Sequence, residues 1–216
     1  MAFPTTGILD SFTGSDETPI ATNWSGPIYS TISQLRRLSN KLAPSATAFG
    51  GSWYDISTFG PNCEVYATID TLANSSSFTG ILYARAINPN TTNLSGYIMQ
   101  IFDTGVGGSG AIGIYREDNG SDTQIGSSYN PPGGLQLGDK YGMSCVGAII
   151  AGFYCPVSTG IWTSAVISAT DATYGAAGFL GVALDSAGAA FRLDQFGGGT
   201  IAVTPPVTPT VAWWKA

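Results

Sequence analysis

Histidine is absent from the 216 residues, and charged side chains account for only 10% of them. Without an imidazole the chain lacks the commonest general base, the usual transition-metal ligand and every Ser-His or Cys-His nucleophile. Basic residues number 8 against 14 acidic ones, which gives a formal net charge of −6 and no basic surface for a phosphate backbone. The sequence therefore predicts a protein that is not an enzyme and does not bind nucleic acid.

Long apolar runs and export signals are also missing. The most apolar segment, residues 145–154, contains Gly147 and Gly152 and is much shorter than the roughly 18 residues that span a bilayer. The N-terminus has no basic region, apolar core or cleavage site typical of a signal peptide. We therefore expect no membrane segment, and synthesis in a host cytoplasm without secretion.

Cysteine is scarce, and Cys63, Cys145 and Cys155 are the three that occur. An odd number cannot pair completely within one chain, and none has a Cys-x-x-Cys or zinc-binding spacing. Buried free thiols are the favoured interpretation. A Cys145–Cys155 disulfide on one hairpin is the alternative.

Glycine and proline, at 29 and 12 residues, are abundant and predict frequent turns. Between the turns, strand-like segments recur about every ten residues. In residues 63–70 apolar and polar side chains alternate as in a half-buried strand. Residues 31–42 suit either a helix or two strands broken near Ser39 and Asn40, and we favour the strands. The other predicted strands are 52–59, 63–72, 80–87, 96–103, 111–116, 140–146, 149–156, 177–185 and 190–196.

Many short strands without intervening helices predict an all-β domain, a two-sheet antiparallel β-sandwich over residues 1–203. The sequence Leu-Asp-Ser-Phe at residues 9–12 is echoed by Leu-Asp-Gln-Phe at residues 193–196. In a sandwich whose terminal strands are neighbours, these two segments would lie side by side.

Residues 204–216 form a short Pro-rich C-terminal arm, a composition that cannot enter a central strand and favours an extended spacer. The arm ends with Val211, Trp213 and Trp214, and large apolar side chains of this kind anchor interfaces. We interpret these three residues as anchors on a partner subunit. The alternative is that the arm folds back over its own sheet.

Several short motifs follow one another in a characteristic order. They are Leu-Asp-Ser-Phe at 9–12, Ala-Thr-Asn-Trp at 21–24, Leu-Ser-Asn-Lys-Leu at 38–42, Trp53, the segment 170–181 and Leu-Asp-Gln-Phe at 193–196. Together they resemble the concanavalin A-like, laminin-G-like jelly roll, in the version common among bacteriophage structural proteins and bacterial carbohydrate-associated modules. The resemblance covers about residues 8–200 and implies two curved sheets of roughly six or seven strands each. It does not imply one function, since the fold hosts lectins, glycanases, lyases and scaffolding modules.

Glycoside hydrolysis on this scaffold needs two carboxylates about 5 Å apart. The related glucanase family carries them on one strand as Glu-x-Asp-x-x-Glu, and no such spacing occurs here. Glu17, Glu64 and Glu117 stand apart in the sequence. Glu117 and Asp118 are expected at a solvated hairpin end, just before the Asn119-Gly120 turn. A glycan hydrolase or lyase therefore stays a third hypothesis.

Calcium is the one cofactor that the sequence leaves open, and Asp118 and Asp122, in a Gly/Asn-rich turn, are the weaker of two candidate sites. Asp10 and Asp194 would meet on neighbouring terminal strands, and Ca²⁺ prefers such oxygen ligands. The full set of six to eight oxygens cannot be named, so local pairing of each acid is the alternative.

Carbohydrate binding would use exposed aromatic side chains as stacking platforms beside polar groups. Because most aromatic residues of a sandwich fill its core, burial is the alternative for each of them. The candidate carbohydrate-binding residues are Trp53, Tyr54, Tyr83 and Tyr129.

The surface composition, poor in lysine and rich in Thr, Ser, Asn and Gly, is typical of an extracellular protein, yet no export signal is present. A virion component reconciles these observations. We predict a non-enzymatic bacteriophage structural protein on the virion surface, a capsid decoration or minor capsid protein. Its partners would be the major capsid protein and further copies of itself in a homo-oligomer. The alternatives are a lectin-like module that adheres to host or environmental glycans, and a minor tail protein.

Overall fold

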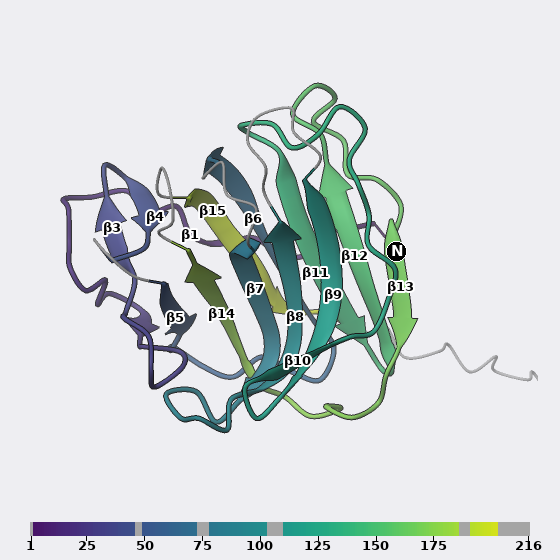
Figure 1. The fold of residues 1–216 in the computed structure, drawn as a ribbon, viewed down its shortest axis with the longest axis horizontal. Helices are drawn as coiled ribbons and strands as arrows, with labels where there is room; N and C mark the ends of the chain where they lie inside the picture. Colours follow the sequence, from purple (N-terminus) through teal and green to yellow (C-terminus); the bar gives the residue numbers. More distant parts are fainter. Residues whose placement is uncertain (1, 46–48, 73–77, 103–109, 186–190, 203–216) are drawn as a thin grey trace, which may run out of the picture.

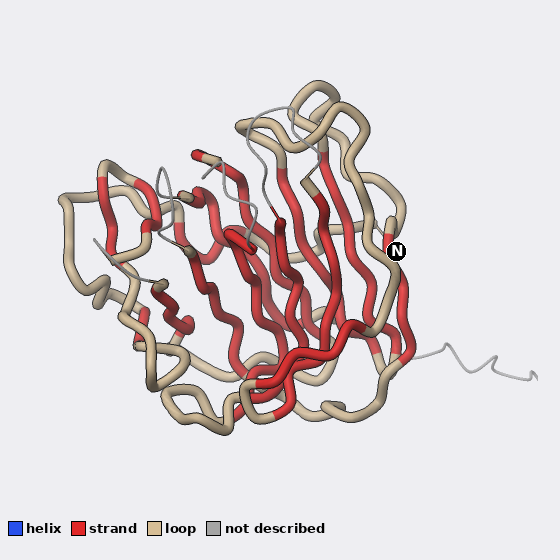
Figure 2. The backbone as a smooth tube through the Cα atoms, in the orientation of Figure 1, coloured by secondary structure: helices blue, strands red, loops and turns tan. Residues whose placement is uncertain are grey.

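The computed structural model describes residues 2–45, 49–72, 78–102, 110–185 and 191–202. Within them lie fifteen β-strands and no α-helix, and Figure 2 shows a backbone made of strands and loops. Accordingly, these residues include no helix that could cross a membrane. The predicted all-β fold is confirmed.

Two antiparallel sheets contain the strands, and Figure 1 shows them stacked as a sandwich. The first sheet has the order β13-β12-β11-β6-β15-β4-β3, with β1 beside β15, and the second has the order β10-β9-β8-β7-β14-β5-β2. The first sheet consists of β1 (Ile8–Asp10), β3 (Arg36–Leu38), β4 (Lys41–Ala43), β6 (Cys63–Thr71), β11 (Lys140–Val146), β12 (Ile149–Cys155), β13 (Ile167–Thr170) and β15 (Arg192–Thr200). The second consists of β2 (Trp24–Ser25), β5 (Gly50–Tyr54), β7 (Phe78–Ile87), β8 (Ser95–Phe102), β9 (Ala111–Asp118), β10 (Ser121–Gln124) and β14 (Phe179–Leu184).

The predicted strand pattern is confirmed over most of the described chain. Residues 31–42 contain β3 and the start of β4, which meet at a turn where Ser39 and Asn40 both have positive φ. Asp10 of β1 lies opposite Phe196 of β15, so the two Leu-Asp motifs lie side by side as predicted. Strands β2, β10 and β13 were not among the predicted strands, and the four residues of β10 are polar and exposed and carry no apolar alternation.

Strand β6 is more deeply buried than its alternating pattern predicts. Its apolar face, with Val65 and Ile69, packs between the sheets. The opposite face is also covered, because Glu64 accepts hydrogen bonds from the backbone of Thr5 and Thr6, and the Tyr66 hydroxyl donates to the Thr6 carbonyl. The N-terminal segment therefore lies over the outer face of the first sheet.

All three cysteines are buried free thiols, as the favoured interpretation had it. The alternative Cys145–Cys155 disulfide is wrong, because the β11–β12 register places Cys145 opposite Ile150 and Cys155 opposite Lys140. The thiol that does face Cys145 across the sheet is that of Cys63 on β6. The hairpin therefore holds Cys145 and Cys155 at its two ends.

Two apolar clusters follow from the alternation along β7. Leu82 points inward to the main core between the sheets, whereas Ile81 and Tyr83 point outward to a second cluster. The connection from β2 to β3 lies over this second cluster, since Ile28 packs into it and donates its backbone N–H to the Gly51 carbonyl. The second sheet thus has an apolar outer face that is partly covered by its own loops. We name it the outer face of the second sheet.

Candidate ligand-binding site

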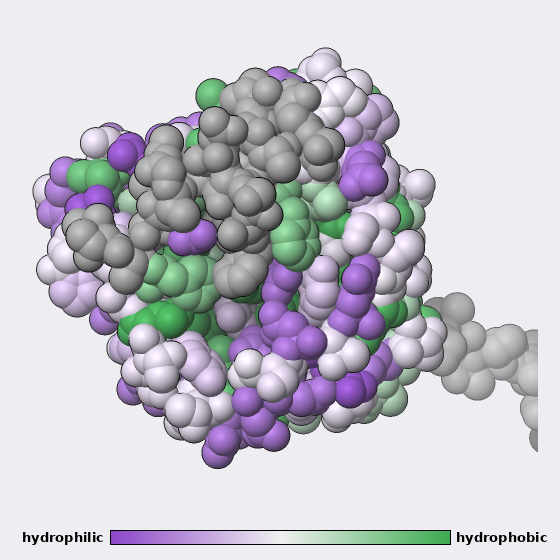
Figure 3. Space-filling view, viewed as in Figure 1, coloured by the Kyte–Doolittle hydropathy of each residue, from purple (hydrophilic) through white to green (hydrophobic). Residues whose placement is uncertain are grey.

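A cavity of about 120 Å³ opens on the outer face of the second sheet. Figure 3 views this side of the molecule: a hydrophobic patch lies left of its centre, and hydrophilic residues lie right of the centre and along the lower edge. The lining of the cavity includes both aromatic and acidic side chains. The lining residues are Tyr29, Phe49, Ile81, Tyr83, Glu117, Gly120 and Asp122.

The acidic part of the cavity is built by the β9–β10 hairpin. Its two-residue turn, Asn119-Gly120, has positive φ at both positions (51° and 76°), which is the conformation that a type I′ turn requires. This turn sets a register in which Glu117 and Asp122 lie directly opposite each other. Opposite residues of an antiparallel pair share one face, with Cβ atoms about 4.5–5.5 Å apart. The hairpin therefore presents two carboxyl groups together.

Glu117 is buried at the inner end of this pair, with an exposed fraction of only 5%. Burial raises the pKa of its carboxyl to about 8, the negative charge of Asp122 adds to the increase, and a hydrogen bond with Tyr83 opposes it. Its Oε2 atom is buried and has no hydrogen-bond partner. A buried polar oxygen without a partner is costly, so a ligand group that forms a hydrogen bond with this oxygen would relieve that cost.

Asp122 lies at the exposed edge of the same cavity, on β10. The side-chain amide of Gln100, on β8, donates a hydrogen bond from Nε2 to Asp122 Oδ2 at 2.7 Å. That contact crosses β9 and orients the carboxylate. Tyr83, on β7, is 4% exposed and lies on the other side of Glu117.

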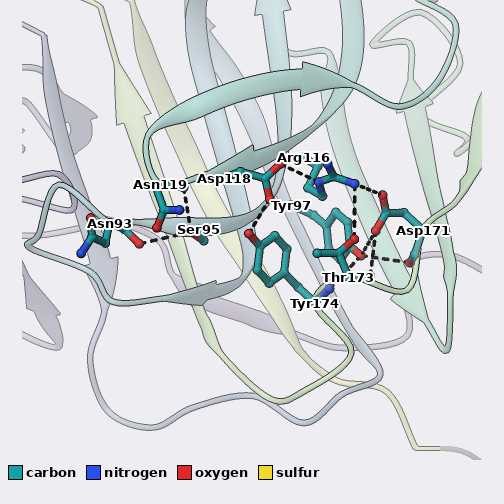
Figure 4. Close-up of polar contacts among 9 residues, drawn as sticks. All are labelled: Asn93, Ser95, Tyr97, Arg116, Asp118, Asn119, Asp171, Thr173 and Tyr174. Atoms are coloured by element: carbon teal, nitrogen blue, oxygen red, sulfur yellow. Dashed lines mark hydrogen bonds and ion pairs between the residues drawn. The ribbon is translucent and has the colours of Figure 1, made fainter.

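A polar network on the inner side of β9 fixes the hairpin that carries the acids (Figure 4). Arg116 donates to Asp118 at 2.7 Å and to Asp171 at 2.8 Å, and the Tyr174 hydroxyl donates to Asp118 at 2.6 Å. The turn itself is held because the backbone N–H of Asn119 donates to the Ser95 hydroxyl at 2.9 Å. Side chains alternate along a strand, so Arg116 and Asp118 point away from the cavity while Glu117 points into it.

Asp171 is the anionic centre of this network. Burial alone would raise the pKa of its carboxyl, but hydrogen bonds from Thr173, Tyr97 and Arg116 outweigh burial and lower the pKa to about 2. The Tyr97 hydroxyl reaches Asp171 Oδ1 at 2.8 Å. The network is therefore charged at neutral pH and supports the site from behind.

The four candidate carbohydrate-binding residues fall into two groups. Tyr83 lines the cavity, and Trp53 packs at the edge of the same outer face against Phe179, with its Nε1 donating to Asp55 at 3.1 Å. Tyr54 is 6% exposed and belongs to the core between the sheets, and Tyr129 packs against that core. The structure thus brings Trp53 and Tyr83 onto one face and places Tyr54 and Tyr129 elsewhere.

Asp10 and Asp194 are held by local donors. Asp10 accepts from the backbone N–H of Phe12 at 2.6 Å and from Trp24 Nε1 at 2.8 Å. Asp194 pairs with Lys41 at 2.7 Å. Across the described ranges, no group of three or more His, Cys, Asp or Glu side chains could hold a metal ion.

The solvated hairpin end expected at Glu117 is wrong. Asp118 is partly exposed, but Glu117 is buried against Tyr83 because β9 turns this position toward the outer face of the second sheet. The sequence did contain a signal for the acid pair, since an Asn-Gly turn of two residues sets Glu117 opposite Asp122. No comparable signal marks Tyr29 and Phe49, which reach the cavity from segments outside the strands.

No protein-family model matches the chain, and no curated protein matches its sequence. Solved structures match its fold. The carbohydrate-binding module CBM66 from Bacillus subtilis has a TM-score of 0.58 at 12% identity, over 82% of this chain and 95% of the module. The exoplasmic/lumenal domain of VIP36, in its Ca²⁺- and Man3GlcNAc-bound form, has a TM-score of 0.58 at 11% identity, over 87% and 86%. A prokaryotic β-1,3-1,4-glucanase (lichenase) from a mouse hindgut metagenome has a TM-score of 0.53 at 9% identity, over 81% and 91%.

Identities this low show the fold and nothing further. Both the element order and these matches agree with the jelly roll that the sequence motifs resemble. The chain has the concanavalin A-like jelly-roll fold, which it shares with carbohydrate-binding modules and lectin-like domains.

Proposed function

We propose that this protein binds a glycan at the cavity on the outer face of the second sheet. The observation that carries the proposal is the buried, unpartnered Oε2 of Glu117 beside the aromatic side chains of Tyr29, Phe49 and Tyr83. Sugar rings combine apolar faces, which stack on aromatic rings, with hydroxyl groups, which donate to carboxyl oxygens. A cavity with aromatic walls and an unsatisfied acceptor suits that combination.

The names of the matching structures support this proposal as analogies. One is a carbohydrate-binding module, and another is a domain bound to Man3GlcNAc. The same fold also serves the glucanase, so fold alone does not separate binding from hydrolysis.

We propose binding without hydrolysis, because only one of the two carboxyl groups is open to solvent. The cavity volume of about 120 Å³ is enough for one small group of a ligand. Hydrolysis is the second candidate, since Glu117 and Asp122 lie directly opposite each other on one face, and a retaining glycosidase uses a pair of neighbouring carboxyl groups. Shortening of bound oligosaccharides during incubation would establish hydrolysis in place of binding.

A matched pair of glycine variants tests the proposed site. A Cβ on Gly120 would lie 2.5 Å from the Tyr29 hydroxyl, so Gly120→Ala fills the cavity mouth. Gly133 has nearly the same φ (80° against 76°) and nothing within 4 Å of a Cβ, so Gly133→Ala carries the same backbone strain without touching the site.

Glycan-array screening followed by calorimetry on the best ligand is the measurement. We expect Gly120→Ala to weaken binding about tenfold or more, the effect of roughly 1.4 kcal/mol. Gly133→Ala should bind as the wild-type chain does. Equal affinities for all three proteins, or no glycan bound by the wild-type chain, would refute the site.

The virion-surface location and the capsid decoration role stay predictions. Their anchors Val211, Trp213 and Trp214 lie outside the described residues, and none of the three matching structures described above is a virion protein. Counting this chain against the major capsid protein in purified particles by quantitative mass spectrometry would test that role.

A further inference from the structure

The cavity brings two acidic side chains together without a basic side chain beside them. Its two ionisable acids are Glu117 and Asp122, and no lysine or arginine is among the described residues that line it. The basic residue nearest in sequence, Arg116, is committed to Asp118 and Asp171 on the inner side of β9. A positive group from outside the protein would therefore meet no competing cation.

Glu117 supplies an acceptor that the protein leaves unused. It is 95% buried, and the Oε2 atom has no donor. A carboxylate accepts hydrogen bonds and donates none, and Gln100 already engages the neighbouring Asp122. At neutral pH the raised pKa of Glu117 means that a proton occupies the site when it is empty. A bound cation would replace that proton.

The remaining walls of the cavity also favour a small cation. Tyr29, Phe49 and Tyr83 are aromatic, and cations are attracted to aromatic faces within about 6 Å. The volume of about 120 Å³ admits one compact group rather than a whole oligosaccharide. An ammonium group brings three donors and no acceptor, which complements a site that offers acceptors.

We propose that the cavity binds the free ammonium group of an amino sugar, placed between Glu117 and Asp122 and flanked by the aromatic side chains. This proposal rests on the proposed glycan binding and names its ligand class, a glycan with a primary amine that is not acetylated. An N-acetyl group would lose the charge and add bulk. A hydroxyl at the same position would supply one donor and no charge.

Three β-1,4-linked tetrasaccharides of equal length separate these cases: tetraglucosamine, its fully N-acetylated form and cellotetraose. Calorimetry at pH 6.5 compares their binding to the wild-type chain. We expect tetraglucosamine to bind at least about tenfold more tightly than the other two, since hydrogen bonds to charged groups contribute that much or more. Binding should also release a proton, which appears as a dependence of the measured heat on the ionisation enthalpy of the buffer.

The variant Glu117→Gln keeps the size of the side chain and removes its charge. It should lower the affinity for tetraglucosamine at least about tenfold. Glu17→Gln is the matched control, because it makes the same exchange at a glutamate that pairs with Arg37 outside the cavity. A loss of affinity that both variants share would report the general attraction between a chain of net charge −6 and any cationic oligomer.

The outcomes distinguish a failure of amine selectivity from a failure of the proposed glycan binding. Equal affinity for tetraglucosamine and cellotetraose, lost in Gly120→Ala, would overturn amine selectivity and leave glycan binding at the cavity intact. Tetraglucosamine binding that Glu117→Gln and Glu17→Gln weaken equally would overturn the amine site. Absence of binding by all three sugars and by a glycan array would overturn the proposed function and this proposal together.

Discussion

The pKa of Glu117 makes a direct prediction about stability. In the native state it is about 8, against an ordinary value of 4.5 that we take for the unfolded chain. Between pH 4.5 and pH 8 the native state holds a proton that the unfolded state has lost, so the free energy of unfolding falls as the pH rises. Below pH 4.5 both states are protonated and the effect is absent. The variant Glu117→Gln has no such proton and should show no such fall.

The size of the effect follows from the interval between the two pKa values. At about 1.4 kcal/mol per pH unit, the wild-type chain should lose up to about 5 kcal/mol relative to Glu117→Gln between pH 4.5 and pH 8. Urea denaturation at pH 5, 7 and 9, followed by tryptophan fluorescence, measures the difference between the two proteins at each pH. Asp122→Asn should reduce the fall, because the Asp122 charge contributes to the raised pKa. A wild-type to variant difference that is constant from pH 5 to pH 9 would refute the reasoning.

Two further predictions concern the supports of the fold. The pKa of Asp171 is about 2 in the native state against 3.8 ordinarily, so its stabilisation is full above pH 3.8 and is lost as pH falls through 2. Asp171→Asn should cost about 2 kcal/mol at pH 7 and almost nothing near pH 2, measured by urea denaturation, and a cost independent of pH would contradict this. Arg85 is 1% exposed and donates to the carbonyls of Pro61, Tyr174 and Gly147. Arg85→Met should therefore lower stability by about 3 kcal/mol or more and Arg85→Lys by less, and thermal melts showing equal losses would argue against a role for the guanidinium fork.

Local patterns were sufficient to predict most of the fold. Strand β6 follows from its alternating residues, the β3–β4 hairpin from the break at Ser39-Asn40, and the pairing of β1 with β15 from two similar tetrapeptides. These features depend on neighbours in sequence or on a repeated motif. Strand β10 escaped prediction because an exposed edge strand needs no apolar face.

The site was harder to predict, because its residues come from segments distant in the sequence. Tyr83 was a candidate, and its partner Glu117 is on a strand two places away in the same sheet. The glucanase motif places its carboxylates on one strand, whereas Glu117 and Asp122 lie on two strands and face each other across a hairpin. Tyr29 and Phe49 reach the cavity only because loops pack over an outer sheet face, and no periodic pattern records such packing.

Two buried glutamates contrast the proposed binding site with a structural contact in this fold. Glu64 is 1% exposed on the outer side of the first sheet, and its Oε1 atom accepts hydrogen bonds from the backbone of Thr5 and Thr6 and from the Thr6 hydroxyl. The N-terminal segment thereby supplies the donors that this buried carboxylate requires, and Glu64 fastens that segment to the sheet. Glu117 is buried almost as deeply on the outer face of the second sheet, yet one of its oxygens has no donor. A buried acceptor is normally satisfied by protein or by bound molecules, so the donor that Glu117 lacks is the one that a ligand in the cavity would bring.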